Sequence, residues 1–266
     1  MMGVRASRPR PFRRWAIFVL TAIASLAAAA SAQEFFGGEG GHEPEVHNIP
    51  YDGRFTFARA RYATGPGGWY YRGLPAWAHG YPNAEQNLMK IMNELSNFRP
   101  HITEDNVYAL DDPELYRYPI VYMTEAGYWS MTDENAKGLR DYLLKGGFAI
   151  FEDFDGAAQW ANFEAQMRRV LPDGRFVRLD RSNRIFGSFF EIKDIDAIVH
   201  PMSRIRPSYY GIFEGNDPSK RLMVIANFDN DVPEYWEWSG QGLFPFDASN
   251  EAYKLGVNYL IYGMTH

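Results

Sequence analysis

Short apolar strands alternate with single amphipathic helices along most of this chain, and no other sequence feature limits its fold as strongly. The apolar segments with strand character are 107–110, 118–123 and 148–151. The segments with helical periodicity are 84–98, 132–146 and 156–171. Neighbouring parallel strands need a crossover connection, which is usually a helix. We therefore predict an α/β fold with a mostly parallel sheet covered by helices on both faces.

Turn and capping residues mark the ends of several expected elements. Thr132 is a good N-cap for the helix that follows it, and Gly146 supplies a left-handed stop. Ser249 is expected to cap a final helix. Strands are also expected at 55–61, where residues alternate, and at 176–179, 209–213 and 222–226. Since there is no internal repeat and no second boundary, we expect one domain over residues 55–266.

The first 32 residues have the pattern of a signal peptide. Five arginines precede an apolar run at 15–30, and Ala30-Ser31-Ala32 fits a small-x-small cleavage site. The run is shorter than the roughly 20 residues of a spanning helix, which favours cleavage over an uncleaved N-terminal anchor. Both Sec and twin-arginine export remain open, because Arg13 and Arg14 form an arginine pair. We expect export to the periplasm or cell surface, without a stable membrane span, and a flexible lead-in at 33–54.

Charge and composition exclude several kinds of function. The formal net charge is −6, and loss of the five arginines before residue 33 would change it to −11. A surface of this sign repels nucleic acid and anionic membranes, so we expect neither as a partner. The chain has no cysteine. Disulfides, thiolate metal sites and a cysteine nucleophile are therefore excluded.

An acidic turn follows the expected strand at 148–151. Glu152, Asp153 and Asp155 stand where ligands of α/β proteins bind, beyond the carboxyl end of a parallel strand. The three carboxylates are candidate ligands for a divalent cation, and Glu152 and Asp153 are candidate catalytic acids or bases. Strand geometry directs Glu152 and Asp153 to opposite faces. Asp155 is equally well explained as the N-cap of the next helix.

A long loop and a neighbouring strand end provide the other candidate ligand-binding residues. The loop at 65–80 and its flank carry the rings of Trp69, Tyr70, Trp77, His79 and Tyr81. These rings would form an aromatic platform over the acidic turn, with His79 as the best acid/base candidate. A plain surface histidine is the alternative for His79, and His200 is expected to be structural. A pocket would require Glu125, Glu152, Asp153 and His79 to converge.

Glu125 and Gly127 close the expected strand at 118–123. In this position Gly127 permits close approach of the backbone to a ligand. A glycine that only reverses the chain direction is an equally good interpretation.

Several spaced segments resemble the bacterial domain family DUF4159. The most specific are Gly80-Tyr-Pro-Asn-Ala-Glu-Gln-Asn87, Tyr118-Pro-Ile-Val-Tyr-Met123, Leu143-Leu-Lys-Gly-Gly-Phe148, Glu152-Asp-Phe154 and Gly263-Met-Thr-His266. The likeness extends from about residue 55 to residue 266. That family in turn resembles the class I glutamine amidotransferase-like superfamily, which implies a three-layer, flavodoxin-like α/β fold.

The resemblance implies an export-associated role but no amidotransferase chemistry. That reaction needs a cysteine at the turn that corresponds to 152–154, together with a histidine base, and the chain has no cysteine. Family members often carry Thr-Asp where this chain has His79-Gly80. They also often carry two histidines in the segment that reads Ser182-Asn-Arg-Ile-Phe-Gly187 here.

These observations lead to one preferred function and two alternatives. We expect a non-catalytic binding module without a cofactor, which recognises a protein or glycan through the acidic turn and the aromatic loop. The first alternative is a carboxylate-dependent hydrolase of a carbohydrate or amide, assisted by a divalent cation. The second is a scaffold component of an envelope assembly, in which Trp236 and Trp238 form the exposed face of an edge strand.

Overall fold

The structure is a computed structural model that describes residues 43–68 and 73–266. All of these residues belong to one compact unit, residues 43–266. The predicted signal peptide, the first part of the lead-in, Trp69 and Tyr70 lie outside the described residues. Within the described part of the chain, no helix is both long and apolar enough to cross a bilayer.

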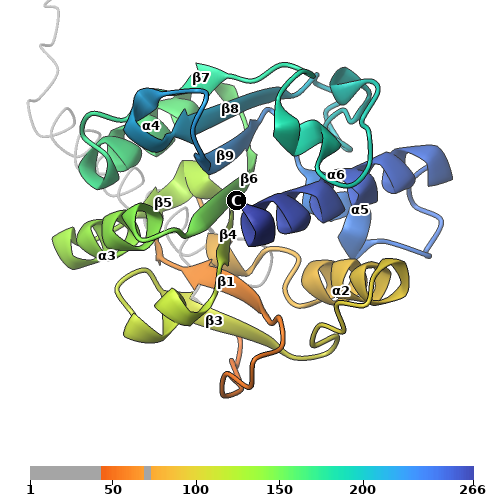
Figure 1. The fold of residues 1–266 in the computed structure, drawn as a ribbon, viewed down its shortest axis with the longest axis horizontal. Coiled ribbons are helices and arrows are strands. Elements are labelled where there is room, and N and C mark those ends of the chain that lie inside the picture. The colour runs from red at the N-terminus through yellow and green to blue at the C-terminus, as the bar shows by residue number, and fades with distance from the viewer. Residues whose placement is uncertain (1–42, 69–72) are drawn as a thin grey trace, which may run out of the picture. The chain divides into compact units, whose positions relative to one another are not determined.

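A seven-stranded sheet forms the centre of the fold (Figure 1). In spatial order its strands are β3 (Asp105–Ala109), β1 (Phe57–Arg61), β4 (Ile120–Thr124), β6 (Phe148–Phe154), β9 (Leu222–Phe228), β8 (Ser208–Phe213) and β7 (Val177–Arg178). The first five run parallel, whereas β8 is antiparallel to both β9 and β7. A separate antiparallel pair joins β2 (Ala63–Thr64) to β5 (Trp129–Ser130). The predicted mostly parallel α/β fold is confirmed.

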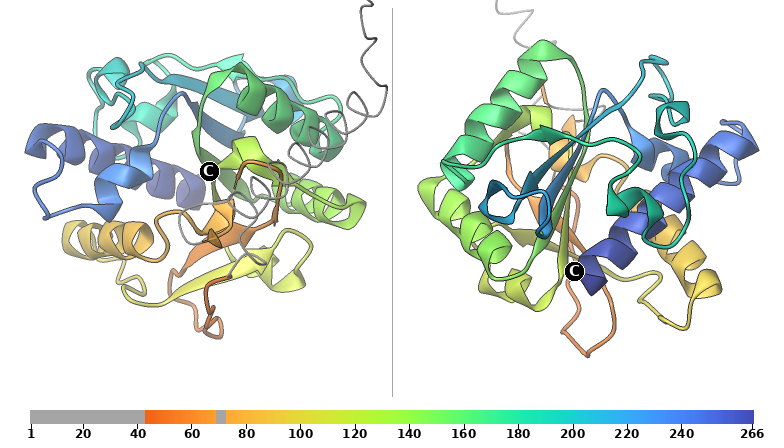
Figure 2. Two further views of the ribbon diagram at one scale, coloured as in Figure 1. Left: turned by 180° about the vertical axis from the view of Figure 1, so that it is seen from behind. Right: turned by 45° about the horizontal axis from the view of Figure 1, so that its top comes forward.

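Helices cover both faces of the sheet and complete a three-layer structure (Figures 1 and 2). Helices α3 (Asp133–Leu144) and α4 (Gly156–Val170) cover one face, on the left of Figure 1. On the other face lie α2 (Asn83–Leu95), α5 (Val232–Glu237) and α6 (Phe246–Thr265). Each face has its own hydrophobic core, with Phe163 at the centre of one and Leu255 in the other. Burial of apolar surface, worth about 25 cal/mol per Å², therefore holds each helical layer to the sheet.

The helix signals at 132–146 are confirmed in detail. The Thr132 hydroxyl accepts a hydrogen bond from the Asn135 backbone N–H at 3.2 Å, and the Asn135 side chain accepts one from the Thr132 N–H at 3.3 Å. This reciprocal capping satisfies backbone donors that the first turn leaves unpaired. Gly146 has the expected positive φ, +115°.

Two predicted elements differ from the structure. Ser249 does not cap the final helix, because α6 already begins at Phe246, directly after Pro245. The segment with Trp236 is helix α5 rather than an edge strand, since the Asp231 side chain caps it and Pro233 lies in its first turn. Trp236 is only 2% exposed. The exposed aromatic face that motivated the scaffold alternative is therefore not formed.

The end of the lead-in follows the edge strand β3. The Asn48 side chain donates to the Val107 carbonyl at 2.9 Å and accepts from the Val107 N–H at 2.8 Å. The Asn106 side chain bonds the backbone of Ile49 in the same two-way manner, at 2.8 and 3.0 Å. β3 is an edge strand, so no further strand bonds its outer backbone groups. The side-chain amides of Asn48 and Asn106 supply hydrogen bonds to these groups and to those of the lead-in.

Candidate functional site

Three neighbouring parallel strands end in acidic residues with a left-handed backbone. Glu125 follows β4, Asp153 lies near the end of β6, and Asp229 follows β9, with φ of +52°, +57° and +58°. This conformation is uncommon for residues other than glycine and costs of order 1 kcal/mol or more. All three residues lie at the carboxyl edge of the parallel strands, which is the edge where α/β proteins bind ligands.

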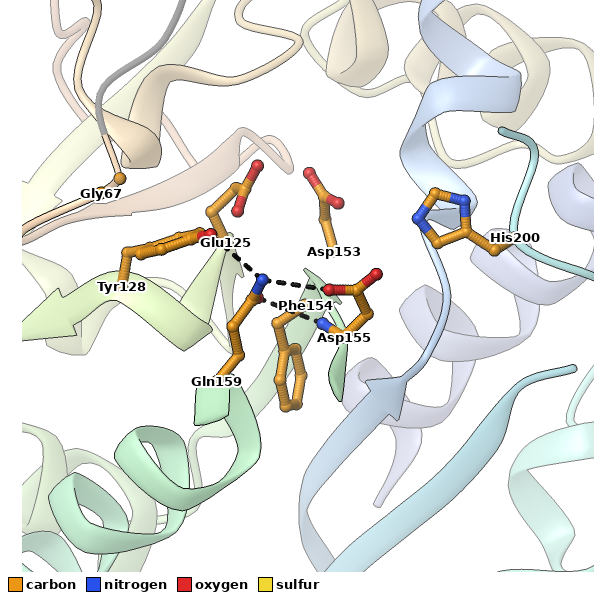
Figure 3. Close-up of a pocket in the computed structure, with 9 residues that line it drawn as sticks. Gly67, Glu125, Tyr128, Asp153, Phe154, Asp155, Gln159 and His200 are labelled. Atoms are coloured by element: carbon orange, nitrogen blue, oxygen red, sulfur yellow. Dashed lines mark hydrogen bonds between the residues drawn. The ribbon is translucent and has the colours of Figure 1, made fainter. Parts of the chain in front are cut away.

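A β-bulge in β6 separates the two adjacent acids. Between Phe151 and Phe154, β6 has one residue more than the facing part of β9, which reorients the side chains there. Glu152 is fully buried in the sheet and accepts a hydrogen bond from the Asn227 side chain of β9. Asp153 points instead toward the edge of the sheet (Figure 3). The predicted divergence of the two carboxylates is confirmed, and Glu152 does not reach the site.

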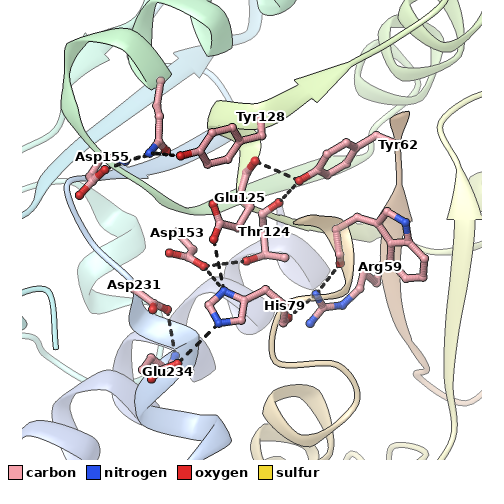
Figure 4. A network of polar contacts seen from close by, with 12 residues as sticks. Arg59, Tyr62, His79, Thr124, Glu125, Tyr128, Asp153, Asp155, Asp231 and Glu234 are labelled. Atoms are coloured by element: carbon pink, nitrogen blue, oxygen red, sulfur yellow. Dashed lines mark hydrogen bonds and ion pairs between the residues drawn. The ribbon is translucent and has the colours of Figure 1, made fainter. Parts of the chain in front are cut away.

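His79 lies at the meeting point of several acids (Figure 4). Its Nδ1 is 2.6 Å from Asp153 Oδ2 and 3.4 Å from Glu125 Oε1. Its Nε2 faces Glu234 of α5 at 3.9 Å. The Thr124 hydroxyl also donates to Asp153, at 3.4 Å. Three of the four residues on which the pocket prediction depended therefore converge, and Glu152 is the exception.

Buried Arg59 of β1 holds the loop that carries His79. Its Nη1 donates to the carbonyl oxygens of Trp77 and His79 at 2.8 and 2.9 Å, and its Nε donates to Glu85 of α2 at 2.5 Å. Arg59 and Glu85 are 0% and 1% exposed. An arginine is rarely buried this completely unless it is paired. Its burial is explained by Glu85, because a buried charge needs a partner of opposite sign.

A cavity of about 310 Å³ opens beside the converging acids (Figure 3). Its lining residues are Gly67, Gly68, Glu125, Tyr128, Asp153, Phe154, Asp155, Gln159 and His200. The Gln159 amide donates to Asp155 at 3.0 Å and to the Tyr128 oxygen at 3.2 Å. The Asp155 side chain makes no capping hydrogen bond to α4. Asp155 is therefore the N-cap residue of α4 by position, as predicted, but its carboxylate faces the cavity instead of capping the helix.

Burial raises the pKa of the acids around His79. Burial, followed by the charge of Asp153, raises the pKa of Glu125 to about 10. Burial likewise raises the pKa of Asp231 and Glu234. Burial alone would lower the pKa of His79, but its hydrogen bond to Asp153 and the surrounding negative charges outweigh burial and raise it. This part of the site therefore retains protons that exposed acids would lose at neutral pH.

The described residues include two sets of three side chains, and in each set three potential metal-binding atoms lie within 4.8 Å of one another. One consists of His79, Glu125 and Asp153, and the other of His79, Glu234 and Glu237. Only the first includes residues that line the cavity. A cation there would meet one imidazole nitrogen and two carboxylate oxygens, a set that can bind several divalent metals.

Five of the predicted ligand-binding residues do not line the cavity, namely Trp77, His79, Tyr81, Gly127 and Glu152, although His79 contacts Glu125 and Asp153, which do. Trp77 is fully buried in the core, so it cannot contribute to an aromatic platform. Tyr81 is half-buried, and its ring lies 5.7 Å from the Arg59 guanidinium carbon. Gly127 leaves room for a neighbouring side chain, since an added Cβ would lie 2.3 Å from the Gln159 amide oxygen. Its role is packing rather than approach to a ligand.

Sequence reasoning missed Tyr128, Gln159 and His200 as cavity residues. Gln159 follows Asp155 by one helical turn, so their contact could have been predicted from the i, i+4 spacing. Tyr128 stands close behind Glu125, but only the short turn after β4 directs its ring to the cavity. His200 was expected to be structural. Its Nδ1 does accept hydrogen bonds from the Met202 and Ser203 N–H groups, yet the residue also lines the cavity.

Comparison with protein families agrees with the spaced sequence segments. The model of DUF4159, described as a domain of unknown function, matches residues 56–264. A comparison with curated proteins found no significant match.

Proposed function

The chain belongs to the DUF4159 family, and we propose that it is an exported binding module for a divalent cation. His79, Glu125 and Asp153 would be the protein ligands. The observation that carries this proposal is their convergence, with His79 Nδ1 at 2.6 Å from Asp153 and 3.4 Å from Glu125. The family description states no activity, so the proposal depends on this geometry.

The chemistry of the three donors supports a cation. Carboxylates bind metals only when ionised, so a cation would replace the protons that burial retains on Glu125. Two carboxylates with one imidazole suit Mn²⁺ or Zn²⁺, whereas Mg²⁺ and Ca²⁺ prefer oxygen ligands alone. The site differs from the predicted set of Glu152, Asp153 and Asp155, because Glu152 is buried elsewhere.

Such a cation would border the cavity, because Glu125 and Asp153 also line it. Tyr128, Asp155 and Gln159 are further lining residues, and a pocket with a few polar groups suits a ligand rich in oxygen. A glycan or a protein carboxylate would supply such oxygens. The predicted protein or glycan ligand is therefore retained, with the cation as its point of attachment.

Metal titration of the purified protein tests this function. We expect Mn²⁺ or Zn²⁺ to raise the melting temperature, since a ligand at 100 times its Kd stabilises the folded state by about 2.7 kcal/mol. Asp153→Asn should remove the effect. Asp229→Asn is the matched control, because Asp229 has the same left-handed backbone at the same edge but is not one of the three donors. Equal stabilisation of both variants would contradict the proposal.

One observation favours the hydrolase as a second candidate. Glu125, with its raised pKa, stands beside the close Asp153–His79 pair, so an acid and a base occur together. Activity against a panel of carbohydrate and amide substrates should then fall at least tenfold in Glu125→Gln. Activity that persists in this variant would exclude Glu125 as the acid.

A further inference from the structure

Arginine recurs at every third position in one segment, at Arg175, Arg178, Arg181 and Arg184. The segment contains the edge strand β7 and runs into a short 3-10 helix at Arg184–Gly187. The turn between β8 and β9 adds Lys220 and Arg221 beside it. Such a concentration of positive charge is unexpected in a chain with a net charge of −6.

Four of these cations line one cavity of about 500 Å³, which we call the basic cavity. They are Arg178, Arg184, Lys220 and Arg221. A second cavity of about 520 Å³ shares Arg184 and adds Arg181. Arg221 directly precedes β9, so the basic cavity lies at the amino end of that strand, whereas the acidic pocket lies at its carboxyl end.

Only some of these charges have structural partners. Arg221 donates to the Gly147 and Leu143 carbonyl oxygens at 2.8 and 2.7 Å and so completes the end of α3. By contrast, the side chains of Arg178, Arg184 and Lys220 make no hydrogen bond or ion pair with any described residue. Like charges that outnumber the counter-charges around them repel one another, and a bound anion would relieve that repulsion.

The acids near the basic cavity offset only part of its positive charge. Asp180 lines the cavity, where its carboxylate accepts hydrogen bonds from the Ser182 N–H at 2.8 Å and the Ser182 hydroxyl at 2.5 Å. Glu214 lies 3.7 Å from Arg221. The lining residues therefore include one acidic side chain against four cations.

We propose that the basic cavity binds a phosphoryl group, carried by a small soluble molecule or by a lipid headgroup. Guanidinium groups match phosphate oxygens in both charge and geometry, and two of the three cations without a partner are arginines. The volume suits a small phosphorylated group. The negative charge of the rest of the chain opposes a long polyanion such as nucleic acid.

Binding of inorganic phosphate and pyrophosphate to the full chain, measured by calorimetry in 0.15 M NaCl, tests the soluble source. Flotation with phosphatidylcholine vesicles, with and without phosphatidic acid, tests the lipid source. We expect saturable binding in at least one arm. The double variant Arg178→Gln/Arg184→Gln should weaken it at least tenfold. The matched control is Arg117→Gln/Arg168→Gln, which removes two arginines with exposed acidic partners elsewhere.

Two further variants keep the outcome decisive. Lys220→Gln changes one exposed side chain, so it should weaken binding even if the double arginine variant does not fold. Asp153→Asn should bind phosphate like the unaltered chain, which separates this proposal from the cation site. Absence of saturable binding in both arms would overturn the inference. Equal binding by the Lys220 variant and the unaltered chain would also overturn it.

Discussion

The regions at the two ends of β9 differ in the sign of the charge that gathers there and in how far that charge is buried. At the carboxyl end, the side chains of Glu125 and Asp153 are only 12% and 11% exposed beside His79. At the amino end, Arg178 and Lys220 are exposed. Buried charges interact strongly and shift their pKa, whereas exposed charges are screened by water and salt. The acidic pocket therefore suits a tightly held small cation, and the basic cavity a weaker, exchangeable anion.

The largest expected effect is a loss of folding stability when Arg59, which holds the loop of His79 beside the acidic pocket, is replaced. Arg59→Met leaves Glu85 buried without its partner, which should destabilise the fold by about 3–5 kcal/mol. Denaturant unfolding measures this loss. The exposed Arg168, which pairs with Glu164, is the control, and Arg168→Met should cost at most about 1 kcal/mol. Similar losses in both variants would show that burial does not distinguish these arginines.

The double variant Arg59→Met/Glu85→Met sharpens this test, because it removes both buried charges. Stability should recover toward that of the unaltered chain. Binding of the proposed cation should remain weakened, since the loop carrying His79 would still lack the two hydrogen bonds from Arg59. Normal cation affinity in the double variant would show that Arg59 does not position His79.

Measuring cation binding in a variant of each site tests whether the acidic pocket and the basic cavity are independent. Asp153→Asn should weaken Mn²⁺ or Zn²⁺ binding about 100-fold or more, because loss of even an outer partner of a metal ligand costs 10–100-fold. Arg178→Gln/Arg184→Gln should leave that affinity unchanged. Calorimetry on both variants measures the effects. Loss of cation binding in the arginine variant would mean that the two ends are coupled.

The stability of the metal-free protein should depend on pH through Glu125. Its pKa is about 10 in the folded state and about 4.3 in an unfolded chain, so the folded state binds the proton more tightly. The stabilisation is complete below the unfolded pKa and falls as pH rises toward 10, by at most about 1.4 kcal/mol per pH unit. Thermal unfolding between pH 5 and 9 measures the slope, which Glu125→Gln should flatten. An unchanged slope would assign the effect to other acids.

The smallest expected effect is that of salt, which should weaken ligand binding at the two ends of β9 to different extents. Raising NaCl from 0.05 to 0.3 M should weaken phosphate binding at the basic cavity several-fold, because screening acts on exposed charges. Cation binding by Glu125 and Asp153 should change less, since their side chains are largely buried. Titrations at both salt concentrations measure the difference. Equal salt dependence would contradict the contrast drawn from burial.

Part of the candidate site was predictable because it depends on local order along the chain. The acids of the 152–155 turn follow an apolar strand, and that order places them at a sheet edge in any parallel α/β fold. The alternation rule also separated Glu152 from Asp153 correctly. It could not show that a bulge carries Asp153 to His79, because the bulge exists only in the pairing of β6 with β9.

Other residues could not be placed because their roles depend on partners distant in sequence. Trp77 reads as a loop tryptophan, yet its side chain is buried in the core and its carbonyl oxygen accepts a hydrogen bond from Arg59. Arg59 itself reads as a polar residue of a half-exposed strand until Glu85 of α2 supplies its counter-charge. Trp236 reads as part of a strand, but the capping residue Asp231 begins a helix there.

The sequence by itself determined the α/β class, the family and the edge of the sheet where acids gather, because periodicity, capping and motif spacing act over short stretches of chain. Only the tertiary structure decided which side chains meet. His79 meets Asp153 across 74 positions of sequence, because a buried ion pair holds the loop of His79 and a bulge reorients Asp153. The physical reason is that burial and strand pairing set both the positions and the pKa values of these groups, and both arise only when distant segments pack together.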